Sequence, residues 1–420
     1  MYEKSVLDNG LRVLTGRLPH TRAVSVSLFV GAGSRYEDDS VAGISHFVEH
    51  MLFKGTERRR APRDIAEAIE GIGGVMNAAT DKELTMYWAK VPVNHFTVAM
   101  DVLLDQYLHS VLDPTELERE RRVVIEELAM VEDSPGELAG LLFENLIWPE
   151  QPLGRDVAGS PESVEGISRS AMMDYLASQY VPENTVIAVA GDVTHEQVVE
   201  EIQERVAGWQ RAPFASWSPS NDGQSARRVG LRSKRTEQAQ ILLGYPAYSA
   251  THPDRYVLDM LNTILGEGMS SRLFLEVREN RGLAYDVHSS VARYADTGAF
   301  VVGAGVDPKK TTECIRAVRG EIDRIRSERV PETELTKVKE YVKGRMQLRM
   351  EDSRAVGSWI GGQELLRGEI RSVDDVLADV DAVTIDDILR VAQDVIREDR
   401  ANLAIVGPFR SVDRFDKLLA

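Results

Sequence analysis

Two histidines and a glutamate lie within five consecutive residues of this chain, in the run His46-Phe47-Val48-Glu49-His50. Residues four apart on an α-helix project from the same face, so the imidazoles of His46 and His50 can bind one metal ion. A zinc hydrolase needs protein ligands, an open coordination position for water, and a base that takes the proton of that water. The spacing therefore predicts that His46 and His50 are zinc ligands and that Glu49 is the base.

A buried helix with two structural histidines is the alternative interpretation of the same run. It arises because the other residues of the segment, Phe47, Val48, Met51, Leu52 and Phe53, are all apolar. A zinc site also requires a third protein ligand, and its presence or absence elsewhere in the chain decides between the two interpretations.

Carboxylates that could supply the third ligand occur in a predicted helix about 70 residues further on. Glu126 and Glu127 are adjacent and compete for this role. Glu120 and Glu127 are seven residues apart, about two turns on one helical face, so Glu120 could support a site that Glu127 completes. Glu126 is rotated by about 100° from Glu127. Three solvated helix charges are the alternative for such a run in isolation.

The elements that must position these residues are arranged in two similar halves. The 420 residues exceed one ordinary core, and 43% hydrophobic with 28% charged residues is typical of a globular protein. Ser, Pro, Asn, Asp and Gly are concentrated in 211–228, which predicts a linker between domains 1–210 and 229–420.

The order of predicted elements in the first half recurs in the second. A hairpin with an Asn9-Gly10 turn comes first, and 23–30 alternates like a strand with one buried face. Long helical stretches then precede a buried strand at 184–191, and similar helices precede a strand at 402–407. We interpret this as an internal duplication with an α+β fold, two homologous α/β domains, each a mainly antiparallel sheet with helices packed on one side. Chance similarity of two α/β halves is the alternative.

Composition excludes some classes of function. A net charge of −17 argues against nucleic-acid binding and favours basic substrates, although a solvated acidic surface also explains it. Cys314 is the single cysteine, so no intrachain disulfide can form, which fits a reducing compartment. No apolar run approaches the roughly 20 residues that span a bilayer, and the N-terminal residues show no secretory or transit pattern. We expect a cytoplasmic protein with no membrane or nucleic-acid partner.

Three segments resemble the pitrilysin/insulinase family of zinc peptidases. They are GISHFVEHMLFKGT at 43–56, GGVMNAAT at 73–80 and ERRVVIEE at 120–127. The likeness extends over essentially the whole chain and is greatest to the processing-peptidase branch, which includes the β-subunit of the mitochondrial processing peptidase. The resemblance implies one Zn²⁺ per chain with Glu127 as third ligand and Glu120 in its support.

The resemblance also implies where substrate binds. In the family, an arginine and a tyrosine seven residues apart bind the substrate backbone and the developing oxyanion. They correspond to Arg278 and Tyr285 in RENRGLAY at 278–285, preceded by the matching GMSSRL at 268–273. Family members pair the substrate as an added strand with a sheet edge, and Asn77, Ala78 and Thr80 match that region.

Shorter family members act as dimers, so the resemblance implies a homodimer with complemented active sites. The chain lacks the long glycine-rich loop of the non-catalytic processing-peptidase subunit, which disfavours an obligate heterodimer. The predicted function is therefore zinc-dependent endopeptidase activity on unfolded peptides in an enclosed chamber. The alternatives are a non-catalytic structural or assembly subunit of the same fold, and a peptide-binding subunit that holds zinc without cleaving.

Overall fold

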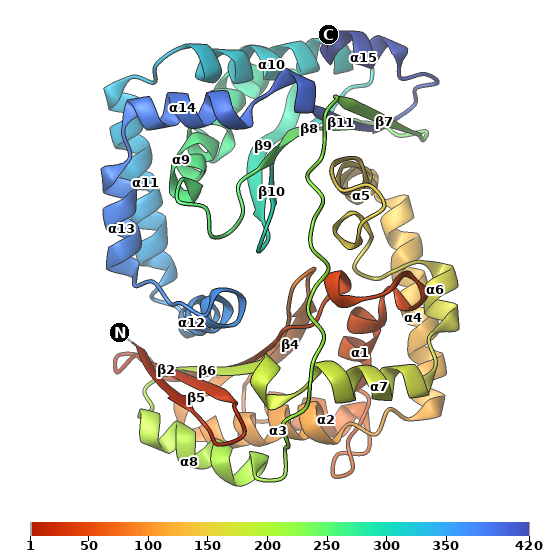
Figure 1. Ribbon diagram of the computed structural model, residues 1–420, viewed down its shortest axis with the longest axis vertical. Helices are drawn as coiled ribbons and strands as arrows, with labels where there is room; N and C mark the ends of the chain where they lie inside the picture. The colour runs from red at the N-terminus through yellow and green to blue at the C-terminus, as the bar shows by residue number, and fades with distance from the viewer. Residues whose placement is uncertain (1, 420) are drawn as a thin grey trace. The chain divides into compact units, whose positions relative to one another are not determined.

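The computed structural model of the protein describes residues 2–419 and contains two compact units (Figure 1). The first contains the chain up to Leu128, Asp156–Ser218 and Gln347–Ser372. The second contains Ala129–Arg155, Pro219–Met346 and the chain from Val373 onward. Each unit thus takes one short segment from the opposite half of the sequence. The predicted domains 1–210 and 229–420 did not include this exchange.

The strands of the first unit form one sheet in the order β1-β2-β6-β3-β5-β4. Their bounds are Tyr2–Val6 (β1), Arg12–Arg17 (β2), Ala23–Val30 (β3), Val75–Thr80 (β4), Thr85–Pro92 (β5) and Thr185–Gly191 (β6). β2 and β6 run parallel, while the other neighbours are antiparallel. The predicted hairpin is β1–β2, and Gly10 in its turn has a φ of 89°, which glycine adopts without strain.

Helices from the first half of the sequence cover one face of this sheet. They are α1 (Ile44–Leu52), α2 (Pro62–Glu70), α3 (Phe96–His109), α4 (Pro114–Asp133, in this unit as far as Leu128), α6 (Pro161–Gly166), α7 (Arg169–Gln179) and α8 (His195–Val206). Alternate residues of the central strands, such as Val26, Leu28 and Ile187, pack with Phe47 and Leu103 in one apolar core. The core fixes α1 against the sheet.

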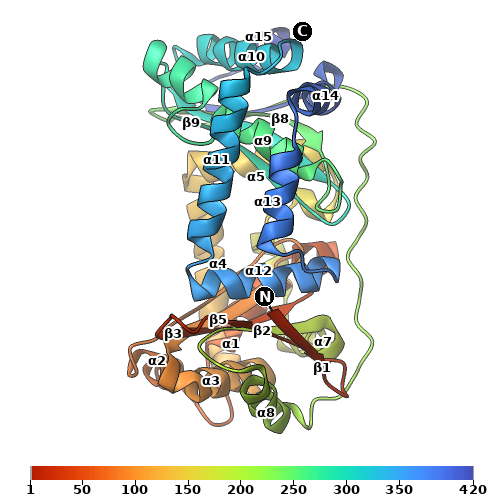
Figure 2. The same cartoon turned by 90° about the vertical axis from the view of Figure 1, so that its left-hand side faces the viewer.

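One helix from the second half, α12 (Ser353–Arg367), covers the other face of the sheet. Figure 2 shows α12 on one side of β2, β3 and β5, with α3 and α8 on the other. Ile360 packs against Leu14, Phe29 and Val186. The segment 23–30, expected to have one buried face, is consequently buried on both faces from its second residue onward. The serines of this segment are buried because they face α12. Ser25 hydrogen-bonds Ser353 of that helix at 2.9 Å.

The second unit repeats the sheet topology of the first. Its order is β7-β11-β8-β10-β9, with β7 and β11 parallel and the other neighbours antiparallel. This matches β2-β6-β3-β5-β4, which agrees with an internal duplication. The bounds are Arg228–Ser233 (β7), Ala239–Ala247 (β8), Ala284–Arg293 (β9), Gly298–Val306 (β10) and Asn402–Gly407 (β11).

Helices cover both faces of the second sheet as well. One face packs against helices from the second half, namely α9 (Arg255–Gly266), the π-helix Phe274–Asn280, α10 (Thr311–Ser327), α11 (Glu332–Arg349), α13 (Val373–Ala382), α14 (Ile385–Val395) and α15 (Asp413–Leu419). The other face packs against α5 (Pro135–Ile147), where Phe143 and Ile147 meet Ala299 and Ala404. α5 therefore covers one face of the second sheet, as α12 covers one face of the first.

The connection between the two halves is free of helix and strand from Gly208 to Arg227, a stretch that contains most of the predicted linker 211–228. Arg35 holds one point of this connection, because its Nε donates to the carbonyl of Ser218 at 2.9 Å and its guanidinium stacks on Trp217. Within residues 2–419, no helix is long and apolar enough to span a membrane.

Candidate metal centre

The histidine motif lies on α1, a nine-residue helix whose apolar side is buried in the core. Gly43 precedes it with a φ of 93°, in the left-handed region, and a Cβ there would lie 2.3 Å from the carbonyl oxygen of Ala158. The buried carboxylate of Glu37 accepts hydrogen bonds from the backbone N–H groups of Gly43 (2.8 Å) and Ser45 (2.9 Å). A carboxylate at a helix N-terminus satisfies free N–H groups and complements the helix dipole. Sequence reasoning missed Glu37, because it lies outside the motif.

His46, His50 and Glu127 converge, with ligand atoms all within 4.8 Å of one another. The two imidazole Nε2 atoms are 3.3 Å apart, and Glu127 Oε2 lies 3.8 Å from His46 Nε2 and 3.5 Å from His50 Nε2. Tetrahedral zinc with bonds of about 2.0–2.1 Å separates its ligand atoms by roughly 3.3 Å. The nitrogen and oxygen donors and their spacing therefore fit a zinc ion. Among residues 2–419 no other such cluster of His, Cys, Asp and Glu side chains occurs.

The first histidine is kept neutral by its surroundings. Burial, and secondarily the neighbouring His50, lower the pKa of His46 to about 4. A neutral imidazole is the form that binds metal. The Nδ1 of His46 is buried without a hydrogen-bond partner, so nothing in the described protein fixes its tautomer.

The second histidine is oriented by a carboxylate behind it. Glu120 Oε2 lies 3.2 Å from His50 Nδ1, and Glu120 Oε1 accepts from Lys54 Nζ at 2.6 Å. A proton on Nδ1 directed at Glu120 leaves the lone pair of Nε2 free for a metal. Glu120 therefore lies behind His50, and its supporting role stays a prediction. Lys54, which lies just beyond the end of α1, was not predicted to take part in the site.

Glu49 faces the same site without belonging to the ligand group. Thr80 Oγ1 donates a hydrogen bond of 2.5 Å to Glu49 Oε2. Burial raises the pKa of Glu49, and the Thr80 hydrogen bond partly opposes this. A carboxylate with a raised pKa is a stronger base near neutral pH. Glu126, by contrast, is exposed and absent from the cluster.

β4 supplies the sheet edge next to this centre. It is the last strand in the order of the first sheet, and α1 packs against it. Its residues alternate between exposed and half-buried. Ala78 and Thr80 are on the half-buried face with α1, whereas Asn77 is exposed on the opposite face and accepts a hydrogen bond from the N–H of Ala78 (2.9 Å). Thr80 therefore has a contact that its predicted role in substrate binding did not include.

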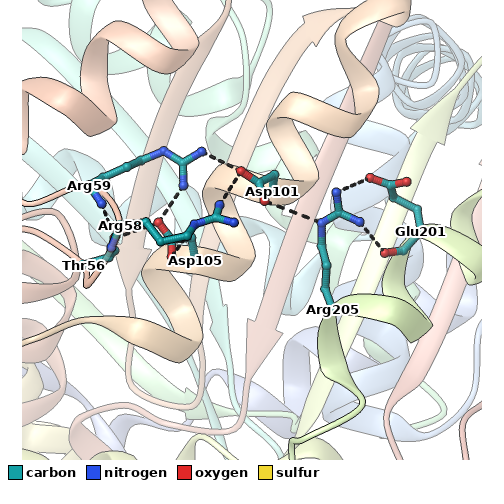
Figure 3. A network of polar contacts seen from close by, with 7 residues as sticks. All are labelled: Thr56, Arg58, Arg59, Asp101, Asp105, Glu201 and Arg205. Carbon is teal, nitrogen blue, oxygen red and sulfur yellow. Dashed lines mark hydrogen bonds and ion pairs between the residues drawn. The ribbon is translucent and has the colours of Figure 1, made fainter.

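The loop that leaves α1 is attached to α3 by a network of ion pairs (Figure 3). Thr56 Oγ1 and Arg59 Nη1 donate to Asp105 Oδ2 at 2.7 and 2.6 Å, and Arg59 Nη2 contacts Asp101 Oδ2 at 2.5 Å. Asp105 is buried. Buried carboxylates thus hold the N-terminal end of α1, through Glu37, and the loop that follows α1, through Asp105. Nothing in the local sequence indicated this network.

Arg278 and Tyr285 lie together in the second unit. Arg278 Nη1 donates to the carbonyl oxygen of Tyr285 at 3.0 Å, and its guanidinium lies 4.3 Å from the centre of the Tyr285 ring and 4.8 Å from that of Phe274. The Tyr285 side chain is prominent, with 75% of its surface exposed. The π-helix carries Arg278, and such helices are rare and frequent at functional sites.

Comparison with known proteins identifies relatives over nearly the whole chain. The family model described as "Insulinase (Peptidase family M16)" matches residues 12–160, and "Peptidase M16 inactive domain" matches 166–342. An uncharacterized zinc protease of Streptomyces coelicolor is 36% identical over 97% of this chain and 90% of its own. The uncharacterized zinc protease YmxG of Bacillus subtilis is 33% identical over 97% and 98%. A solved protease from Helicobacter pylori has the same fold, with a TM-score of 0.92 at 23% identity over 97% and 99% of the two chains.

Proposed function

The chain belongs to the insulinase family of M16 peptidases, and from this premise we propose that it is a zinc endopeptidase that hydrolyses unfolded peptides. The observation that carries the proposal is the convergence of His46, His50 and Glu127 within 4.8 Å, with Glu49 beside them. A non-catalytic subunit would have no need of this combination of a ligand group and an adjacent base.

The roles in the reaction follow from the chemistry of these side chains. A zinc ion supplies Lewis acidity, which lowers the pKa of water and polarises a carbonyl oxygen. Glu49 takes the proton of the attacking water at a carboxylate oxygen, and its raised pKa suits this task. It then delivers that proton to the leaving amine. The Thr80 hydroxyl holds the Glu49 carboxylate in place, and Glu120 holds His50.

Arg278 and Tyr285 are the proposed donors to the oxyanion and the substrate backbone. The proposal rests on the family resemblance, and the contact between the two residues supports it. Stacking against Phe274 and Tyr285 limits the conformations of the Arg278 side chain, so less entropy is lost when it binds an anion. The substrate backbone would pair with the exposed edge of β4 near Asn77 and Ala78.

A Glu49→Gln variant tests the proposal most directly. It removes the base but none of the three proposed ligands, so bound zinc should stay near one ion per chain. Hydrolysis of a quenched fluorescent peptide should fall by about 10²–10⁴-fold, the usual contribution of a general base. Purified wild-type protein that holds no zinc, or full activity in the variant, would refute the enzyme claim. Stoichiometric zinc and peptide binding without any cleavage would instead support the peptide-binding alternative.

We further propose a homodimer in which each chain completes the site of its partner. Mixing inactive Glu49→Gln and inactive Tyr285→Phe chains should then restore up to about a quarter of wild-type activity per chain, because mixed dimers contain one intact site. Each variant alone, carried through the same exchange, is the control. Absence of rescue after exchange proven by mass spectrometry of mixed species would contradict complementation.

A further inference from the structure

The face of the first sheet that carries α12 has an exposed cation beside the β4 edge. Arg354, in the first turn of α12, places its guanidinium 3.8 Å from the centre of the Trp88 ring. Trp88 on β5 is only 8% exposed, whereas Arg354 itself is exposed. Residues 2–419 provide no hydrogen-bond acceptor or carboxylate for this guanidinium, since Asp352, the nearest acid in the sequence, pairs with Lys90 at 2.5 Å.

The pairing register places Trp88, on which Arg354 stacks, next to the outermost strand. Trp88 is the partner of Asn77 across the β5–β4 pair, so both side chains stand on the same face. The same face carries two more contacts between α12 and β5, Asp352 with Lys90 and Ser358 with Met86. α12 itself packs over β3 and β6, and these side chains reach from it to β5, the strand next to β4.

A substrate strand added to β4 would lie about 4.8 Å outside it. Every second substrate side chain would stand on the face of Asn77, and those between would stand on the face of α1 and Glu49. The contact with Trp88 is a cation–π contact with the ring and uses none of the guanidinium N–H groups as hydrogen-bond donors, so these groups can donate to a ligand. A planar fork of donors matches the two oxygens of a carboxylate.

We propose that Arg354 is a specificity-determining residue that binds a substrate carboxylate, from an Asp or Glu side chain or from the peptide C-terminus, on the α12 face of the β4 edge. The proposal rests on the proposed function, because it assumes that substrate pairs with β4. It refines the expectation of basic substrates. The chain as a whole has a charge of −17, but at this position a local cation selects an acidic group.

The pleat of the sheet makes the proposal sharply testable. In peptides blocked at both ends, one Glu is moved stepwise through the sequence, with the Gln peptide of the same sequence as reference at each step. The full-length zinc-loaded protein should prefer Glu over Gln by about tenfold in kcat/KM, the lower end of a hydrogen bond to a charged group. The preference should occur at one position or at alternate positions, and not at the positions between them. Peptides with a free or amidated C-terminus, shortened by one residue at a time, separate the terminal carboxylate from the side chain.

In Arg354→Gln the Glu/Gln ratio should fall to about one, and Arg354→Lys, which keeps the charge but not the fork, should give an intermediate ratio. Arg349→Gln removes an equally exposed charge at the end of α11 and should leave the ratio at the wild-type value. A wild-type ratio of one at every position and for both termini would overturn the proposal. A Glu/Gln ratio that stays at the wild-type value in Arg354→Gln would also overturn it. So would an equal fall of the ratio in Arg349→Gln, because that would show an effect of overall charge and not of Arg354.

Binding measurements separate this proposal from the proposed activity. The Kd of labelled Glu and Gln peptides is measured by fluorescence anisotropy with full-length Glu49→Gln protein, with and without Arg354→Gln. A carboxylate preference that depends on Arg354, in a protein whose wild type cleaves nothing, would leave the inference standing and refute the peptidase. Cleavage by the wild type, with equal Kd values for the Glu and Gln peptides of every pair, would support the peptidase and refute the role of Arg354.

Discussion

Among individual residues, the adjacent carboxylates Glu126 and Glu127 differ in what they can bind. Glu127 Oε2 is within 3.8 Å of both imidazole Nε2 atoms, whereas Glu126 is exposed and outside the cluster. Glu127→Gln should lower zinc affinity by more than about 100-fold, because loss of an outer-sphere partner alone costs about 10–100-fold. The matched change Glu126→Gln should leave it within about twofold. Competition with a chromophoric chelator measures both zinc affinities. Equal losses of affinity in the two variants would show that the assignment of Glu127 as the ligand is wrong.

His46 gives a pH dependence with a defined sign. Its pKa falls from an ordinary value of 6.5 to about 4 in the folded, metal-free protein, so the unfolded chain takes up a proton first as pH falls. Between pH 6.5 and 4 this should reduce the free energy of unfolding, by at most about 3.5 kcal/mol at about 1.4 kcal/mol per pKa unit. The difference in urea stability between wild type and His46→Gln in EDTA should therefore shrink or reverse on acidification. A constant difference from pH 7 to 4 would contradict the pKa shift.

The sequence predicted the part of the site that one helix brings together. The spacing of His46, Glu49 and His50 sufficed because helical periodicity is local. Choosing Glu127 over Glu126 required the family resemblance, since their helix meets α1 only through tertiary packing. Glu37, which holds the N-terminal end of α1, and Asp105, which holds the loop after it, could not be found, because nothing in the local sequence indicates a long-range contact to a carboxylate.

Among the elements, α12 approaches its sheet closely because Gly357 and Gly361 face it, whereas Gly362 does not. A Cβ on Gly361 would lie 2.2 Å from Phe29 Cε2, while one on Gly362 would meet nothing within 4 Å. Gly361→Ala should therefore reduce the free energy of unfolding by about 1–3 kcal/mol through overpacking. Gly362→Ala should increase it by about 0.5–1 kcal/mol, as expected for Ala over Gly inside a helix. Urea unfolding of the pair measures both, and similar effects of the same sign would refute the close approach.

The periodicity of single elements predicted most strands and helices but not which faces they cover. The segment 23–30 alternates apolar residues with serines, which is typical of a strand with one solvated face. The serines are nevertheless buried, because Ser25 bonds Ser353 and Ser27 lies beside Gly357 of α12. A helix more than 300 residues away in the sequence thus changes the environment of the strand, and only the tertiary structure reveals it.

In the whole molecule, each compact unit is completed by a helix from the other half of the sequence. The first sheet requires α12 to cover Leu14, Phe29 and Val186, and the second requires α5 to cover Ala404 and Val406. The duplicated halves are thus interleaved, so covalent order alone does not define an autonomous catalytic domain. All proposed metal ligands nevertheless belong to the first unit.

This interleaving predicts how the halves behave when separated at the Ser218–Pro219 bond of the connection. Fragment 1–218 lacks the segment Gln347–Ser372 and should expose the apolar face that α12 covers, so we expect aggregation or strong binding of a hydrophobic dye. Fragment 219–420 lacks α5 and should behave likewise. Co-expression of both fragments should restore cooperative unfolding and zinc binding, because every contact of both sheets can then form.

Fusing residues 347–372 to fragment 1–218 through a flexible linker is the discriminating control. It should reduce dye binding and restore zinc affinity without the remainder of the second half, since α12 and the proposed ligands His46, His50 and Glu127 are then on one chain. Fragment 1–218 that alone unfolds cooperatively and binds zinc with wild-type affinity would show that the covering helix is dispensable. In that case the boundary at 211–228, and not the exchange of helices, would define the folding unit.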